Sequence, residues 1–202
     1  VVSTRGSDEE LYGQVAYAQA VGSEGLRLRA TLAHDRTRPG HGLGSFDVEG
    51  KTTFGDLSAA YPLVRTRARS LYLEGGLQAS DSRQEALDER LYHDQLRVLY
   101  AGLTADLLDG WGGRSQLGVG LRQGLSVLGA SDEGDADLSR VEGVPDATVV
   151  RVQGARYQPF GSTPWGLLTS VKGQYAWDPL LVDEELGLGG APFGRGYAPA
   201  DI

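Results

Sequence analysis

The residues best suited to chemistry stand at the end of the chain, where one arginine is enclosed by glycines. The segment Leu186–Ile202 reads LGLGGAPFGRGYAPADI. It holds too many glycines for a strand and too few charges for a solvated tail, so we expect it to fold back on another part of the protein. Arg195 is the strong hydrogen-bonding group that could anchor it, because a guanidinium presents five donors in a rigid fork. The expected anchoring motif consists of Gly189, Gly190, Phe193, Gly194, Arg195, Gly196 and Tyr197.

Other residue types that support catalysis or metal binding are poorly placed for it. The chain has no cysteine, and His34, His41 and His93 are too scattered to suggest a metal site. The acidic stretch Asp132–Asp137 lacks the spacing and the terminal glutamate of an EF-hand. No nucleophile elbow or phosphate-binding loop is present. We therefore expect no enzyme, no cofactor and no metal.

Composition narrows the class of protein further. The formal net charge of -8 argues against nucleic acid as a partner, since nucleic acid requires a basic face. No apolar run is long enough for a transmembrane helix, and no signal peptide opens the chain. The sequence contains no methionine even at its first position, and it stops in a loop-like segment. We expect it to be an excerpt of a longer protein, cut at both ends.

The dominant pattern along the chain is alternation with a period of two, which predicts long β-strands. Four ranges alternate cleanly over 9 to 13 residues, well beyond the ~5–6 of ordinary strands: Gly25–Ala33, Leu71–Ser80, Ser115–Val127 and Trp165–Trp177. Four alternate less regularly: Leu11–Ala20, Thr52–Tyr61, Leu96–Asp106 and Thr148–Gln158. The faces of 96–106 and 148–158 stay open. The pattern predicts eight strands and no convincing helix; Gln84–Tyr92 could form a helical turn but is better suited to a loop.

The connections between these strands alternate in length. Short turns are expected at Val21–Glu24, Pro62–Ser70, Leu107–Arg114 and Pro159–Pro164, and long polar loops at His34–Lys51, Asp81–Gln95 and Gly129–Ala147. Short turns at one end and long loops at the other are typical of a transmembrane β-barrel. The sequence therefore predicts an all-β fold that spans a membrane as an antiparallel barrel.

The two faces of the predicted strands differ as a barrel requires. One face is rich in leucine and valine, whereas the other interleaves glycine with the candidate lumen-lining residues Arg27, Arg29, Glu74, Arg122 and Lys172. These charges could line a translocation path, or could simply pair with one another for solubility. Trp165 and Trp177 share the apolar face twelve residues apart. At ~3.3 Å per residue and a ~45° tilt, that separation is ~28 Å along the membrane normal, close to the ~25 Å between aromatic girdles.

Two stretches of the chain resemble a known family. Leu188–Tyr197, LGGAPFGRGY, resembles the sixth extracellular loop of two-partner secretion transporters, the haemolysin secretion/activation proteins of the ShlB/FhaC/HecB type. Phe46–Leu73 is similar to the same family, with a D-x-x-G strand entry followed by YPL-x-R across a tight turn. Gly194 departs from the β-branched residue that much of the superfamily carries there. This departure weakens the similarity to barrel-assembly proteins more than that to the secretion branch.

The resemblance implies a 16-stranded outer-membrane barrel that is preceded by two periplasmic domains, which this stretch of chain does not include. It implies that residues 1–202 cover strands four to eleven and the start of the sixth loop. That loop would fold into the lumen, where Arg195 would pair with an aspartate of a later strand beyond Ile202. The implied protein is a monomeric pore in the outer membrane of a Gram-negative bacterium. Its partners would be the lipid bilayer and a secreted, β-rich, haemolysin- or adhesin-like client.

Three other functions fit parts of the pattern. A barrel-assembly insertase of the same superfamily would carry more periplasmic domains upstream. A passive porin would need no inward arginine loop. A soluble β-sandwich that acts as a binding module would have an aqueous surface in place of the lipid-facing one.

Overall fold

The described part of the protein is built from long β-strands. The structure is a computed structural model that describes residues 2–5, 10–38, 48–87 and 89–187. Within these ranges nine strands form: β1 (Val2–Arg5), β2 (Glu10–Val21), β3 (Leu26–Thr37), β4 (Glu49–Arg65), β5 (Arg69–Ala86), β6 (Glu89–Leu108), β7 (Arg114–Gly124), β8 (Thr148–Pro159) and β9 (Gly166–Ala176). All eight strands expected from the alternation pattern are present, and β1 is an additional one. One 3-10 turn, η2 (Val182–Glu184), follows β9.

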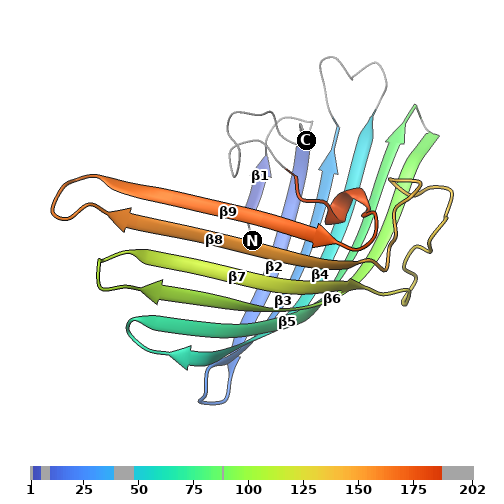
Figure 1. The fold of residues 1–202 in the computed structure, drawn as a ribbon. Helices are drawn as coiled ribbons and strands as arrows, with labels where there is room; N and C mark the ends of the chain where they lie inside the picture. Colours follow the sequence, from blue (N-terminus) through green and yellow to red (C-terminus); the bar gives the residue numbers. More distant parts are fainter. Residues whose placement is uncertain (1, 6–9, 39–47, 88, 188–202) are drawn as a thin grey trace.

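These strands make one antiparallel sheet in which each strand pairs with the next along the chain, from β1 to β9. Figure 1 shows the sheet curling, so that β8 and β9 come to lie across from β2 to β4. The register shifts between Pro62 and Val64 in β4, at a proline that has no N–H to donate to the ladder. No helix in the described ranges has the length and apolar character needed to cross a membrane.

Outward positions of the strands carry large aliphatic side chains that have no cover. They include Leu32 at 61% exposed, Leu57 at 62% and Val171 at 60%. An apolar band of this extent on a folded surface indicates contact with another apolar phase, here consistent with lipid around a barrel. Trp165 and Trp177 lie just beyond the two ends of β9 and are also exposed, and the Trp177 ring packs edge-to-face on Tyr175 at 5.0 Å.

The connections at the two ends of the sheet differ in length. At one end they are the short turns 22–25, 66–68, 109–113 and 160–165. At the other end, 125–147 is a long segment without strands. The long loop expected at Asp81–Gln95, with the loop favoured for Gln84–Tyr92 inside it, is wrong, because β5 and β6 continue as a paired hairpin through this range. Charged side chains make the range resemble a loop, yet Asp81 accepts from Arg83 along β5 and contacts His93 across the hairpin.

Segment 125–147 and the residues after β9 fold over the inner face of the sheet at this end. Leu138 and Leu181 cover Leu96 and Val98 of β6, and all four are at most 7% exposed. A second cluster joins Val149 and Ala147 to Leu180. The approach is closest at Gly124, where an added Cβ would lie 2.1 Å from the backbone oxygen of Pro145. A glycine is therefore required where the loop turns in against the wall.

Candidate functional site: the inner wall and the segment folded against it

The inner wall of the sheet is polar over β4 to β9. The ladder sets Arg122 of β7 directly opposite Tyr100 of β6, and it sets Arg151 of β8 opposite Gln174 of β9. Side chains of directly opposed residues point to the same face of a sheet. Contacts of η2 with both β5 and β8 place that turn on the concave side, so this face is the inner one (Figure 1).

Glu184 of η2 is the centre of a charged cluster on this wall. Both of its carboxylate oxygens accept from Arg122, at 2.7 and 2.9 Å from Nη2 and Nε, which is a bidentate fork. Arg151 Nη2 adds a bond of 3.1 Å to the same carboxylate and one of 2.8 Å to the Glu184 carbonyl. The side chains of Glu184 and Arg122 are only 10% and 13% exposed. Two arginines from neighbouring strands thus bind one carboxylate that is delivered by the segment after β9.

Neutral side chains complete the coordination of these groups. Gln174 donates to the Glu184 carbonyl at 2.9 Å and accepts from Arg151 at 3.0 Å. Gln78 of β5 accepts from Arg122 at 2.9 Å. The described hydrogen bonds of this cluster therefore involve β5, β7, β8 and β9, and through them η2 is bound to the wall.

Tyr100 extends the polar surface toward β4. Its ring lies beneath the Arg122 guanidinium, 5.7 Å from Cζ, and its hydroxyl donates to Asp56 Oδ2 at 2.8 Å. Gly76 makes this possible, because a Cβ there would be 2.7 Å from the Tyr100 hydroxyl oxygen. The tyrosine thus lies across β5 and links the arginine cluster to a carboxylate two strands away.

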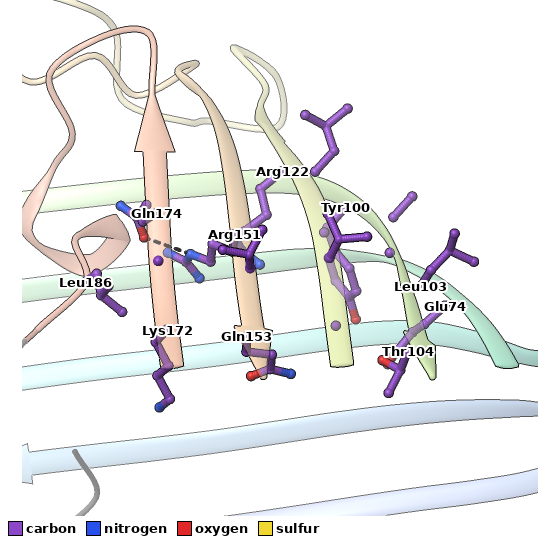
Figure 2. Close-up of a pocket in the computed structure, with 18 of the residues that line it drawn as sticks. Glu74, Tyr100, Leu103, Thr104, Arg122, Arg151, Gln153, Lys172, Gln174 and Leu186 are labelled. Carbon is purple, nitrogen blue, oxygen red and sulfur yellow. Dashed lines mark hydrogen bonds between the residues drawn. The ribbon is translucent and has the colours of Figure 1, made fainter. Parts of the chain in front are cut away.

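A cavity of about 430 Å³ opens on the wall beside this cluster (Figure 2). Arg122, Arg151 and Gln153 line it together with Glu74 and Lys172, and Leu186 contributes from the segment after η2. Its floor is made by strand glycines such as Gly102 and Gly120. The lining combines side chains of both charges with apolar ones such as Leu103 and Leu186.

A second set of contacts holds the same cover further along the wall. Ser82 of β5 donates to Asp183 at 2.5 Å, and the backbone N–H of Ser139 donates to Asp94 at 2.9 Å. Asp94 is fully buried, and within the described residues its Oδ2 atom has no hydrogen-bond partner. Burial raises the pKa of Asp94, and the nearby carboxylate of Asp183 raises it further, while the hydrogen bonds from Ser139 act in the opposite direction.

The register brings the expected charged residues to one face. Arg27 and Glu74 both lie opposite Ala60 in β4, and Arg29 lies in the neighbouring row that also contains Tyr100 and Arg122. Lys172 lies opposite Gln153. Of the five, the structure places Glu74, Arg122 and Lys172 around the cavity, whereas Arg27 and Arg29 lie apart from it on β3.

The structure also assigns the two strands whose faces the sequence left open. In β6 the even positions from 94 to 104 point inward, and in β8 the odd positions from 149 to 155 do so. The alternation is obscured because Leu96, Val98 and Val149 point inward although they are apolar, being covered by the folded segment. Tyr100 and Arg151 are therefore not predicted from the sequence, although the isolated arginine among the valines of β8 is a signal for this wall. Gln174 and Glu184 are not predicted either, because their roles depend on the contact of η2 with the wall.

The glycine-arginine motif, from Gly189 to Tyr197, lies outside the described residues. Its expected role therefore stays a prediction. What the structure describes is the segment that leads to it, 178–187, and the way in which that segment is bound to the wall.

Comparison with known proteins identifies a matching family and solved structures with a similar fold. A family model described as "Haemolysin secretion/activation protein ShlB/FhaC/HecB" matches residues 5–201. Among solved structures, CdiB from Escherichia coli aligns over 95% of this chain with a TM-score of 0.79 and 21% identity. CdiB from Acinetobacter baumannii aligns over 96% with a TM-score of 0.68 and 16% identity. None of the curated protein sequences matches the chain.

The chain spans about a third of the length of these solved structures, 35% and 34% respectively. The likeness confirms the fold expected from the sequence, an all-β antiparallel sheet that is part of a transmembrane barrel. The family resemblance read from the two sequence stretches is confirmed as well. On the match over 5–201, the chain belongs to the haemolysin secretion/activation protein family ShlB/FhaC/HecB.

Proposed function

We propose that this chain is part of an outer-membrane pore that exports a partner protein by two-partner secretion. The observation that carries the proposal is a polar inner wall behind an apolar outer face, in a chain of this family. The client would be a β-rich, haemolysin- or adhesin-like protein that passes through the lumen unfolded. The barrel would act as a monomer in the outer membrane of a Gram-negative bacterium, without a catalytic step.

Within a 16-stranded barrel we assign β2 to β9 as strands four to eleven, which would make β1 the third. The segment after β9 would then begin the sixth extracellular loop. Arg195 would anchor that loop to a later strand, with Gly194 and Gly196 permitting close approach and Tyr197 packing against the wall. Arg27, Arg29, Glu74, Arg122 and Lys172 would line the path, while Trp165 and Trp177 would lie in the two aromatic girdles.

The described contacts indicate what must change for a client to pass. Segment 178–187 and loop 125–147 cover the inner wall at the end with the longer loops, and η2 is bound there through Glu184 and Asp183. An extended chain needs this part of the wall exposed. We propose that transport requires η2 to leave it.

A reversible crosslink tests this requirement. Ser82→Cys and Asp183→Cys in the full-length protein would join β5 to η2, since Ser82 Oγ and Asp183 Oδ2 lie 2.5 Å apart. The sequence of residues 1–202 contains no other cysteine that could compete. We expect oxidation to stop client secretion and reduction to restore it. Secretion that continues at the normal rate with the disulfide formed would overturn the proposal.

A matched control separates the effect of joining η2 to β5 from the effect of any disulfide in the barrel. His34 and Thr53 are opposed on β3 and β4, and their side chains meet at 3.0 Å on the outer face. His34→Cys with Thr53→Cys joins two strands that need not move relative to each other. This pair should secrete normally in both redox states, with the mobility of the folded barrel on gels as the check on assembly.

A further inference from the structure

Cationic side chains gather on the outward face of the sheet near the end with the longer loops. Arg36 of β3, Lys51 of β4 and Arg83 of β5 are direct neighbours across three strands, and His93 of β6 continues the row. Like charges placed directly opposite each other destabilise a sheet. Three stand in succession here although the formal net charge of the chain is -8, so nearby anions must offset their mutual repulsion.

The carboxylates nearby offset only part of this charge. Glu49 pairs with Arg36, Arg38 and Lys51, and Asp81 pairs with Arg83. The hydrogen bond from Arg38, with those from Arg36 and Lys51, lowers the pKa of Glu49 to about 2, so this carboxylate is ionised at neutral pH.

We call Arg36, Lys51 and Arg83 the basic patch. Among the described residues these three cations pair with two carboxylates, Glu49 and Asp81, and their side chains are 38–45% exposed. Glu85 follows at the hairpin tip but lies opposite Arg90, which balances it. Within the described residues the basic patch therefore carries one more positive charge than the two carboxylates that pair with it, and its side chains are accessible from outside.

The patch stands just beyond the apolar band. On β3 the last apolar outward residue is Leu32, and Arg36 is the second outward position after it; on β5 Ala79 and Arg83 are related in the same way. Four residues at ~3.3 Å and a ~45° tilt rise ~9 Å along the membrane normal. That height is close to the headgroup layer, and long basic side chains bend toward it.

The opposite face of the same strands has another character. In the adjacent row, Asp35, Thr52, Ser82 and Asp94 point inward. The positive charge thus belongs to the membrane side of this strand end and not to the strand end in general. Short turns mark the other end of the sheet, so the patch would face the outer leaflet.

We infer that the basic patch binds the phosphorylated headgroup of an anionic lipid in the outer leaflet. The inference rests on the membrane placement in the proposed function. Guanidinium forks pair with phosphate oxygens in bidentate geometry, and Lys51 adds a point charge between two of them. Bound phosphate would offset the repulsion within the row, and it would hold β3, β4 and β5 in contact with their lipid surroundings.

The test compares lipids that differ only in phosphate. The full-length protein is placed in phosphatidylcholine nanodiscs that contain bis-phosphorylated lipid A or its dephosphorylated form, and retained lipid is measured by native mass spectrometry. We expect preferential retention of the phosphorylated lipid. The triple variant R36Q, K51Q and R83Q should bind it about 100-fold more weakly, at roughly fivefold per charge near the membrane surface.

A control with the same change in charge lies at the other end of the same hairpin, where Arg65, Arg67 and Arg69 are exposed around the turn 66–68. R65Q, R67Q and R69Q should retain lipid as the native protein does. Equal retention of the two lipids, or a triple patch variant that binds like the native protein, would overturn the inference. If the triple variant does not fold, Lys51→Gln and Arg83→Gln singly should each weaken binding about fivefold.

Lipid binding and secretion are separate readouts. Loss of lipid retention with normal secretion would leave the proposed transport function standing. Conversely, a protein that retains the lipid normally and still secretes while η2 is crosslinked to β5 would contradict the transport proposal alone.

Discussion

Two adjacent glutamates make the strongest contrast at the scale of single residues. Glu184 is 10% exposed and binds Arg122 and Arg151, whereas Glu185 is 42% exposed and pairs with Arg140 at the surface. Removing one partner of a buried pair costs about 3–5 kcal/mol, while an exposed pair contributes about 0–1 kcal/mol. We expect Glu184→Ala to release segment 178–187 from the wall, and Glu185→Ala to leave it bound.

Limited proteolysis of the assembled barrel measures this difference. Cleavage within 178–187 should accelerate strongly in Glu184→Ala and stay near the native rate in Glu185→Ala. Glu184→Gln should fall between the two, since the amide oxygen still accepts a bond but no longer balances the two arginines. Equal cleavage of all three variants would show that the arginine cluster does not hold the segment.

At the scale of elements, the alternation of apolar and polar residues predicted eight strands, and all eight are present as β2 to β9. The pattern is reliable in a barrel wall because successive residues face lipid and water in turn. It failed where that contrast ends. Beyond the apolar band both faces of β5 and β6 are polar, so the hairpin through Asp81–Gln95 resembled a loop. It also failed under the cover, where Leu96 and Val149 face inward. Contacts such as that of Arg122 with Glu184 join positions far apart in the sequence, and no local pattern reveals them.

The attachment of loop 125–147 should depend on pH through Asp94. Burial raises the pKa of this carboxyl above its ordinary value of about 4, and Asp183 adds to the shift. The protonated form is therefore favoured in the folded state. The attachment should be strongest below the ordinary pKa, and it should weaken as the pH rises through the raised value.

Hydrogen exchange of segment 125–147, corrected for the intrinsic rate, checks this dependence. Protection in the native protein should fall as the pH rises, and Asp94→Asn should flatten the profile, because the amide oxygen can still accept from the Ser139 N–H without titrating. Glu133→Gln, an exposed acid on the same loop, should leave the profile unchanged. A native profile without slope would exclude Asp94 as the titrating group.

For the whole molecule, the two faces of one sheet decide between a membrane pore and a soluble β-sandwich. A sandwich would bury the aliphatic face against a second layer and expose the polar face to water. In the described residues the aliphatic face has no second layer, while the polar face is the one that is partly covered. A pore has this arrangement, because its core lies outside, in lipid, and its water lies inside.

Neighbouring residues of β9 turn this distinction into a measurement. Val171 is 60% exposed on the outer face, and Lys172 lines the inner cavity. In the full-length protein in membranes, a water-soluble maleimide should label Lys172→Cys many times faster than Val171→Cys, whereas a lipid-soluble nitroxide should quench a probe on residue 171 more than one on residue 172. Gly173→Cys, which faces outward by the alternation of the strand, should again be labelled slowly from water. Equal aqueous labelling of 171 and 172 would mean that both faces meet water, and it would contradict the barrel in lipid.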